Sequence, residues 1–120
     1  MNVRDRLISA LAPCGVEVCY QGSLSDAEPL SDTFITYQIS DSSDESYYDN
    51  DAQRHVTHIQ LIIYTTKMSI IKTLPLQVSS LIKQAGFTRQ SLGRDHGFYE
   101  QHYAWLMEIH FTERKHSDVQ

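Results

Sequence analysis

The sequence lacks the features that mark membrane-spanning, exported and nucleic-acid-binding proteins. Its longest apolar stretches fall far short of the ~20 residues that a membrane-spanning helix needs. The start at Met1 has mixed charge and no apolar core after it, so it does not resemble a signal peptide. No basic run is longer than Arg114-Lys115, which disfavours a protein that binds phosphate backbones. We therefore expect a soluble protein that stays in a cytosol-like compartment.

Cysteine is also scarce. The two cysteines, Cys14 and Cys19, are five residues apart, which is not the C-x2-C spacing of zinc and redox motifs. A short disulfide between them is sterically allowed, but disulfides are rare in proteins that are not exported. Two reduced thiols are therefore expected, with Cys19 buried as a small apolar side chain.

Motifs for nucleotide binding and nucleophilic catalysis are missing as well. The five glycines are scattered and form neither a G-x-G-x-x-G nor a Walker-type loop. There is no G-x-S-x-G elbow and no cysteine in a glycine-rich turn. Paired carboxylates occur only in the polar segment 41–51, where nothing buries them. We expect no catalytic residue, no cofactor and no metal ligand, and hence a protein that is not an enzyme.

What the sequence does contain is a composition typical of one folded domain. Its 120 residues are 41% apolar and 21% charged, which are ordinary values for a globular protein. This length fits one hydrophobic core and leaves little room for a second. We predict a single α+β domain over residues 1–112 and a polar C-terminal tail over 113–120.

The net charge of −5 is concentrated in one segment, 41–51, with the sequence DSSDESYYDND. This segment contains five acids and two tyrosines, namely Asp41, Asp44, Glu45, Tyr47, Tyr48, Asp49 and Asp51. Outside it the ten remaining acids balance the ten bases. An EF-hand loop is a poor match, because Ser46 occupies the position that requires glycine. Two interpretations stay open: a solvated loop or frayed hairpin tip, and a functional surface that uses this charge together with the tyrosines.

Two helices are predicted from apolar spacing. The first begins at an Asn2 cap and carries a stripe made of Val3, Leu7, Ile8 and Leu11, before Pro13 and Gly15 end it. The second is expected from about Thr73 to Ala85, with Gly86 as its stop. Pro75 is tolerated only in a first turn, where its missing N–H costs nothing, so a kink or turn is expected at 69–72.

Five strands are predicted from β-branched and alternating residues, over 16–20, 33–39, 54–66, 87–92 and 99–111. A glycine-bounded turn is expected at 93–97. The resulting order is α-β-β-β-α-β-β. This order predicts the α+β class, with two helices packed on a single, mainly antiparallel sheet.

Histidine is abundant, with six residues, so a metal site needs a test. In the stretch RHVTHIQLIIYTT (54–66), strand alternation puts His55 and His58 on opposite faces, while Ile59, Leu61 and Ile63 enter the core. His102 and His110 share a face but lie about 26 Å apart along an extended strand. A cross-strand pairing of His58 with His102 or Glu100 remains an alternative to polar residues on a half-exposed sheet face.

The last strand has two distinct faces. Tyr103, Trp105, Met107 and Phe111 form an apolar and aromatic face, which we expect in the core. Ala104 and Leu106 point the other way, together with Ile62 and Tyr64 of the preceding long strand. We expect this second sheet face to be partly covered, with a neighbouring subunit as one candidate cover.

The order and spacing of these segments resemble a known group of proteins. The segments that carry the likeness are VRDRL (3–7), GVEVCYQ (15–21), TFITY (33–37), the acidic connector before 58–64, LIKQAGF (81–87) and GFY (97–99). They resemble the tail-completion or tail-terminator proteins, also called head-tail joining proteins, of long-tailed bacteriophages and prophages. The likeness covers nearly the whole chain and is one of order, length and loose pattern. Pro75 departs from the uninterrupted second helix of that pattern.

The resemblance implies a structural virion protein of the tail neck, assembled in the host cytoplasm. Its subunits would form a ring, most often a hexamer, that terminates the tail tube and joins it to the head connector. The partners would be the tube protein, the connector and other copies of the chain, with no membrane. DNA would pass through the channel without specific binding, and the acidic segment would line that channel or dock on a neighbouring ring. The alternatives are a small module that binds peptides along a sheet edge and, more distantly, a metal-dependent enzyme.

Overall fold

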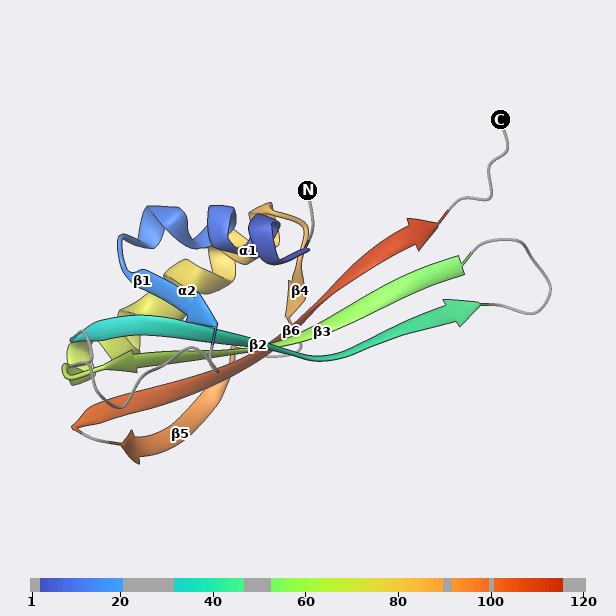
Figure 1. Ribbon diagram of the computed structural model, residues 1–120. Coiled ribbons are helices and arrows are strands. Elements are labelled where there is room, and N and C mark those ends of the chain that lie inside the picture. Colours follow the sequence, from blue (N-terminus) through green and yellow to red (C-terminus); the bar gives the residue numbers. More distant parts are fainter. Residues whose placement is uncertain (1–2, 21–31, 47–52, 90–91, 100, 116–120) are drawn as a thin grey trace.

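Two helices pack on one face of a mainly antiparallel sheet (Figure 1). The computed structural model describes residues 3–20, 32–46, 53–89, 92–99 and 101–115. The elements in these ranges are α1 (Val3–Leu11), the 3-10 turn η1 (Ala12–Cys14), β1 (Glu17–Tyr20), β2 (Thr33–Ser46), β3 (Gln53–Thr65), α2 (Met68–Gln84), β4 (Thr88–Arg89), β5 (Arg94–Tyr99) and β6 (His102–Lys115). The predicted α+β class and the order of helices and strands are confirmed.

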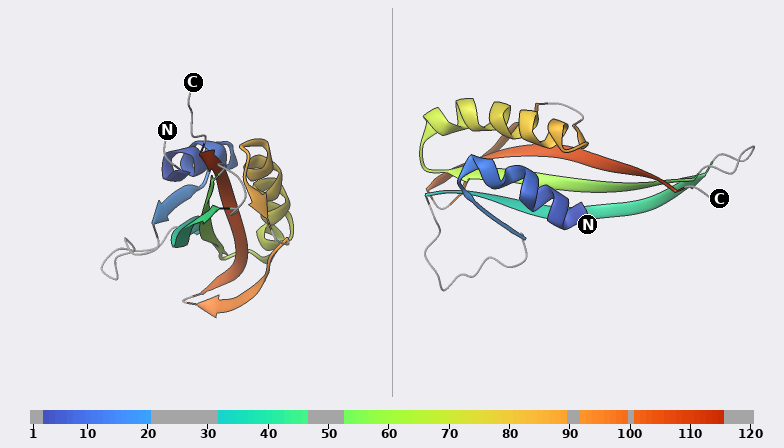
Figure 2. Two further views of the ribbon diagram at one scale, coloured as in Figure 1. Left: turned by 90° about the vertical axis from the view of Figure 1, so that its right-hand side faces the viewer. Right: turned by 90° about the horizontal axis from the view of Figure 1, so that it is seen from above.

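The described strands form one sheet with the order β1-β2-β3-β6-β4. β1 runs parallel to β2, and the other neighbouring strands are antiparallel. β4 and β5 both pair with β6, β5 along residues 102–106 and β4 at His110 and Ile109. β1 therefore forms one edge of the sheet, and β4 and β5 share the opposite edge, as the end-on view in Figure 2 shows.

Three strands continue beyond the part of the sheet that the helices cover. β2, β3 and β6 remain paired from Thr33–Thr65 to the register pair Gln53–Lys115, with a bulge between Ile39 and Asp41. Figures 1 and 2 show them projecting together as an arm, and the molecule is elongated to 52 × 29 × 24 Å. We call residues 41–46, 53–58 and 110–115 the arm.

The core lies between the helices and the inner face of the sheet. It contains alternate residues of β2, β3 and β6 and one stripe from each helix, namely Ile35, Tyr37, Ile59, Leu61, Ile63, Met107, Ile109, Leu7, Leu11, Leu74, Val78 and Ile82. The predicted core positions Ile59, Leu61 and Ile63 are each at most 1% exposed. The period of two on the strands and the helical period on α1 and α2 thus put most of the expected residues inside. Ile8, which was expected in the apolar stripe of the first helix, is instead 37% exposed.

α1 is held at its C-terminal end and through Arg6 near its middle. Pro13 lies in η1, and Gly15 at φ +71° closes the turn that follows the helix, as the sequence predicted. On its inner side the Arg6 guanidinium lies 4.9 Å from the centre of the Phe111 ring and donates a hydrogen bond of 3.3 Å to the Ala85 carbonyl. Arg6 therefore connects α1 to β6 and to the end of α2.

The predicted start of the second helix is wrong. α2 begins at Met68 rather than at Thr73, and Pro75 lies inside it with no turn at 69–72. Proline removes one helical hydrogen bond, and here the bond lost is the one to the Ile71 carbonyl. The apolar side of the helix compensates, because Leu74, Pro75 and Val78 are all buried. Packing on the sheet outweighs the local preference of proline.

The turn predicted at 93–97 is also wrong. Residues 94–99 form β5, which pairs with β6 up to Tyr99–His102, so β6 begins at His102 rather than at residue 99. Gly97 lies at the register shift of this pair, where its amide donates to Asp95 Oδ1 at 2.9 Å. Glycine here permits a bulge within a strand. The reversal falls just before β6, where Gln101 has φ +71°.

Other boundaries also differ from the predictions, most of all that of β2, which was expected over 33–39 and runs to Ser46. The strand expected over 87–92 is confined to Thr88–Arg89 in the described residues. The tail was predicted to begin at Glu113, whereas β6 runs to Lys115.

Candidate functional site

The first half of the predicted acidic site lies on a strand, not in a loop. Asp41, Asp44 and Glu45 belong to β2, which corrects the loop interpretation for these residues and favours the hairpin. The remaining predicted residues, Tyr47, Tyr48, Asp49 and Asp51, lie outside the described residues. The described part of the acidic segment, residues 41–46, is thus carried on the arm, beyond the helices.

The register places basic or imidazole residues opposite each acid of β2. The Cα partners of Asp41, Asp44 and Glu45 on β3 are His58, His55 and Arg54. On the far side of β3, Arg54 pairs with Arg114 of β6. The described part of the arm therefore contains both acidic and basic residues on neighbouring strands and is not acidic throughout.

The histidine pair that the structure forms differs from the pair that was considered. His58 is the Cα partner of His110, and their ring centroids are 5.9 Å apart. His102 lies elsewhere on the sheet, with its ring 5.4 Å from that of Phe34. Glu100 lies outside the described residues. Among the described residues no group of three or more His, Cys, Asp or Glu side chains is arranged to hold a metal ion.

The outer face of the sheet carries a small apolar cluster. Ile62, Ala104 and Leu106 are 4%, 1% and 3% exposed in the single chain, and Tyr64 packs against them. The Tyr64 ring stacks on Phe34 at 4.9 Å. The predicted cover of this face exists, but the single chain already provides it. These residues therefore give no evidence for a neighbouring subunit.

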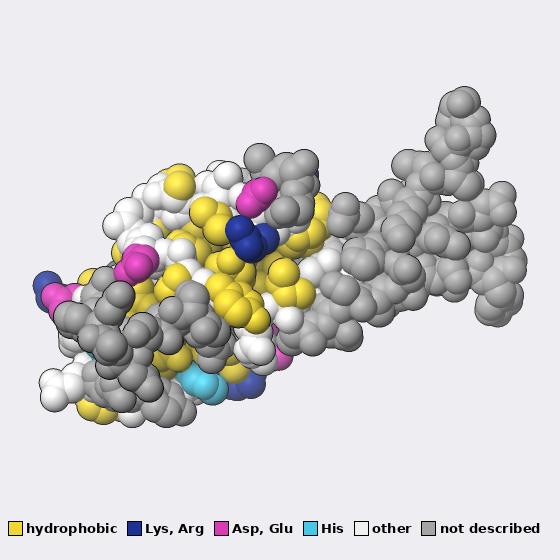
Figure 3. Space-filling model, in the orientation of Figure 1, with side chains coloured by type: hydrophobic (Ala, Val, Ile, Leu, Met, Phe, Trp, Pro, Cys, Tyr) yellow, Lys and Arg dark blue, Asp and Glu magenta, His cyan; other side chains and the backbone are white. Residues whose placement is uncertain are grey.

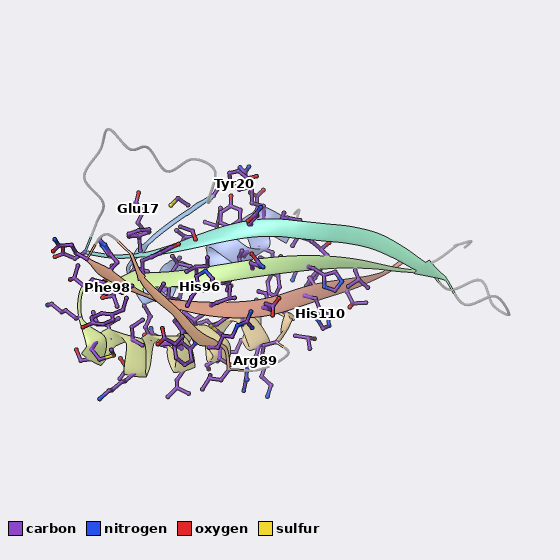
Figure 4. All side chains as sticks on the ribbon, turned by 90° about the horizontal axis from the view of Figure 1, so that it is seen from below. Glu17, Tyr20, Arg89, His96, Phe98 and His110 are labelled. Carbon is purple, nitrogen blue, oxygen red and sulfur yellow. The ribbon has the colours of Figure 1, made fainter. Side chains whose placement is uncertain are left out.

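Large apolar side chains remain exposed in two separate groups. One group comprises Ile8 of α1, Tyr20 of β1 and Ile39 of β2. The other comprises Met68 and Leu76 of α2 with Leu92 and Phe98 on the opposite edge of the sheet. Figure 3 shows apolar side chains gathered over α1, β1 and β2, and Figure 4 shows Tyr20 and Glu17 along the β1 side with Arg89 on the other side. We call these surfaces the β1 edge and the α2–β5 edge.

The α2–β5 edge contains a groove of about 360 Å³. Its floor and walls are mostly apolar, with Met68, Ile71, Pro75 and Leu76 from α2, and Leu92, Tyr103 and Trp105 from the sheet side. Two charged residues, Lys72 and Asp95, also line it. The groove is thus suited to an apolar body that carries a polar tip.

One wall of the groove depends on a close backbone approach. The Trp105 indole donates a 3.0 Å hydrogen bond to the Leu92 carbonyl. Next to Leu92, Gly93 has φ +108°, and a Cβ built there would lie 2.5 Å from both the Leu106 oxygen and Trp105 Nε1. Only glycine fits this position, and it allows the segment before β5 to lie against β6.

Both cysteines are free, and neither is fully buried. Burial raises the pKa of the Cys14 thiol above its ordinary value. The pKa of Cys19 is raised by burial and, to a smaller extent, by the negative charge of Glu17. A raised pKa keeps the thiol protonated and opposes its use as a nucleophile.

No protein-family model matches this sequence, and no curated protein matches it either. Within the part of the chain that the structure describes, no helix is long and apolar enough to span a membrane.

Proposed function

We propose that this protein is a structural component of a phage tail, which forms a ring at the head-proximal end of the tail tube. In this role it terminates the tube and joins it to the head connector. The observation that supports the proposal most directly is the arm, a three-stranded extension of the sheet that continues past the helices. The likeness in element order to tail-completion proteins supports it from the sequence side.

The body and the arm of the subunit have different roles in this proposal. The body, with α1 and α2 over the inner face of the sheet, contains the core and keeps the subunit folded. No helix in the described ranges lies over the arm, and the molecule is 52 Å long. A long, regular ribbon of this kind positions its end at a fixed distance from the body. That geometry suits a subunit that contacts a second ring above or below its own.

The proposal includes a set of partners. Copies of the chain form the ring, most often a hexamer in the proteins it resembles, and the tube protein and the connector lie on its two sides. DNA passes through the channel without specific binding. The protein acts in the neck of the virion after assembly in the host cytoplasm, and its role is geometric rather than enzymatic.

In this proposal the acidic segment lines the channel or docks on a neighbouring ring. Its candidate residues are Asp41, Asp44, Glu45, Tyr47, Tyr48, Asp49 and Asp51. Acidic side chains in a channel repel DNA phosphates and keep the genome from adhering during passage. Because Arg54 lies opposite Glu45 in the register and an imidazole lies opposite each of Asp41 and Asp44, we expect Asp49 and Asp51 to contribute the larger share of this repulsion.

The decisive experiment is electron microscopy of the purified protein with isolated tails. We expect a ring at one end of the tail tube. Absence of bound protein, or binding along the tube wall, would contradict the proposal. Binding of an extended peptide along β1 or β5 without any association with tails would instead favour a sheet-edge binding module.

A second experiment tests the acidic segment alone. The five acids are changed to Asn or Gln, and tail joining and DNA ejection are measured in phage carrying the variant. The matched control is Glu108→Gln, because Glu108 is a half-exposed acid whose 3.4 Å ion pair with Arg94 is exposed and therefore weak. Normal joining and normal ejection in the five-acid variant would exclude the proposed role of the segment.

A further inference from the structure

We propose that copies of this chain associate head to tail, with the β1 edge of one copy docking into the groove of the α2–β5 edge of the next. Tyr20 is the anchor that enters the groove. This inference rests on the proposed ring and deepens it by naming the two surfaces through which subunits meet. It is testable on the purified protein without any other tail component.

The exposed apolar side chains lie on two different surfaces of the subunit. Tyr20 is 49% exposed on the β1 edge, and Leu76 and Phe98 are 58% and 60% exposed on the α2–β5 edge. These two edges lie on opposite sides of the sheet (Figure 2). A ring in which every subunit makes the same contact requires two different, complementary surfaces on opposite sides of each subunit. The exposed apolar residues are distributed in that way.

The chemistry of the Tyr20 side chain matches that of the groove. A tyrosine side chain has an apolar ring and a polar hydroxyl. The groove has apolar walls formed by residues such as Leu76 and Trp105, and it also presents Lys72 and Asp95, which can bond a hydroxyl. Its volume of about 360 Å³ is sufficient for one aromatic side chain. Tyrosine is also among the residues that most often dominate binding energy in protein interfaces.

The two edges carry opposite net charges. The exposed charged residues of α1, β1 and the residue before β2 are three acids and one base, namely Asp5, Glu17, Asp32 and Arg4. Those of α2, its N-cap, β4 and β5 are five bases and one acid, namely Lys67, Lys72, Lys83, Arg89, Arg94 and Asp95. Arg94 pairs with Glu108 of β6, and the surface remains basic when Glu108 is included. Opposite charges on the two edges favour docking of one edge on the other.

The same charges disfavour the symmetric alternative. In a two-fold dimer each surface meets its own copy. A groove-to-groove dimer would bring the basic α2–β5 edges together, and like charges at an interface cost free energy. Head-to-tail contact avoids this repulsion. The second copy is therefore the occupant that the chain itself supplies, with a side chain small enough for the groove and with matching polarity and charge.

The test uses two variants that each remove one surface. Leu76→Asp places a charge in the groove, and Tyr20→Asp places one on the anchor. Gln77→Asp is the matched control, because Gln77 is an exposed neighbour of Leu76 on α2 and does not line the groove. Circular dichroism and thermal unfolding verify that each variant is folded. Ile8→Asp, also on the β1 edge, replaces Tyr20→Asp if the latter fails to fold.

Two readouts follow association. Sedimentation gives the mass as a function of concentration. Trp105 is the single tryptophan of the chain and lines the groove, so its fluorescence reports directly on groove occupancy. We expect the wild type and Gln77→Asp to gain mass with concentration while their emission shifts to shorter wavelength. Leu76→Asp and Tyr20→Asp should each weaken association about tenfold or more.

Mixing the two defective variants gives the sharpest outcome. Each retains the surface that the other lacks, so the mixture should form a one-to-one dimer and nothing larger. A mixture that stays monomeric overturns the head-to-tail arrangement. The proposal is equally overturned by a wild type that remains monomeric up to its solubility limit, or by self-association that survives either variant.

The two levels of the proposal can fail separately. If the mixed dimer forms but no ring binds to isolated tails, the interface stands and the tail function fails. If rings bind to tails and remain intact with Leu76→Asp or Tyr20→Asp, the tail function stands and the interface fails.

Discussion

His58 and His110 lie directly opposite each other on β3 and β6, with their ring centroids 5.9 Å apart. Nδ1 of His110 is buried and has no hydrogen-bond partner among the described residues. Leaving a buried polar atom unpaired costs about 1–3 kcal/mol. We therefore expect His110→Leu to leave the free energy of unfolding unchanged within about 1 kcal/mol, or to raise it. Urea unfolding checks this.

His102→Leu is the contrasting variant for that measurement. His102 is also buried, but its ring packs against Phe34 and it takes part in further interactions. Its replacement should lower the free energy of unfolding by about 1–3 kcal/mol. A large loss of stability in His110→Leu would mean that Nδ1 has a partner in solution, and the histidine pair would then need a new explanation.

Gly93→Ala should destabilise the protein severely. The new Cβ would lie 2.5 Å from backbone and indole atoms of β6, and φ at this position is +108°. Overpacking and backbone strain of this kind each cost about 1–3 kcal/mol. We expect a loss of about 2–4 kcal/mol in the free energy of unfolding, together with a change in Trp105 fluorescence as its hydrogen bond to Leu92 is broken.

Gly15→Ala is the control for that prediction. Gly15 also has a positive φ, at +71°, but nothing lies within 4 Å of a Cβ built there. Only the conformational penalty remains, and it is about 1 kcal/mol. Equal losses in the two variants would show that the close approach at Gly93 contributes nothing to stability.

The predictions that succeeded depend on periodicity. Ile59, Leu61 and Ile63 alternate along a strand, and the two-residue repeat assigns them to one face whatever the strand pairs with. The same holds for Trp105 and Met107 on the last strand. Burial on a regular element is therefore encoded locally, and the sequence predicted the core face of the sheet and of α2. For α1 the prediction was right at Leu7 and Leu11 and wrong at Ile8, which is exposed.

The predictions that failed depend on tertiary packing. The glycines of 93–97 are typical of a turn, but Gly93 provides a close approach and Gly97 a bulge, and both roles require β6 as a partner. The groove was not predicted for a related reason. The helical period puts Leu76 on the side of α2 away from the core residue Leu74. That Leu76 lines a groove with Leu92 and Trp105 depends on the arrangement of α2 on the sheet.

The acidic segment shows the same limit at the candidate site. Its charges could be counted from the sequence, but its register could not. The hairpin pairing of Asp44 with His55 and of Glu45 with Arg54 depends on how β2 and β3 align over their whole length. A bulge between Ile39 and Asp41 shifts that alignment by one residue. The local sequence contains no signal that predicts this bulge.

Pro75→Ala should stabilise the protein. Alanine restores the amide that can bond the Ile71 carbonyl, and proline inside a helix costs about 3 kcal/mol relative to alanine. Part of this gain is offset, because the Pro75 ring is buried and its removal leaves a small void. We expect a net increase of about 1 kcal/mol in the free energy of unfolding by urea titration. A decrease would mean that the packing of the ring outweighs the missing hydrogen bond.

We expect the free energy of unfolding to decrease at alkaline pH because of the two thiols. Burial raises the pKa of Cys14, and burial with the charge of Glu17 raises that of Cys19. The folded state therefore holds these protons to a higher pH than the unfolded state does. Their contribution to stability is fully present below the ordinary thiol pKa of about 8.5 and is lost as the pH rises through the raised values.

Unfolding of the wild type and of the double variant Cys14→Ala/Cys19→Ala should be compared at pH 7 and at about pH 10. Tyrosines and lysines titrate in both proteins, so the difference between the two pH profiles isolates the thiols. We expect the wild type to lose more stability than the variant over this range. Parallel profiles would show that the thiols ionise as easily in the folded protein as in the unfolded chain. Fast reaction of both cysteines with a thiol reagent at pH 8 would point the same way, because the thiolate is the reactive form.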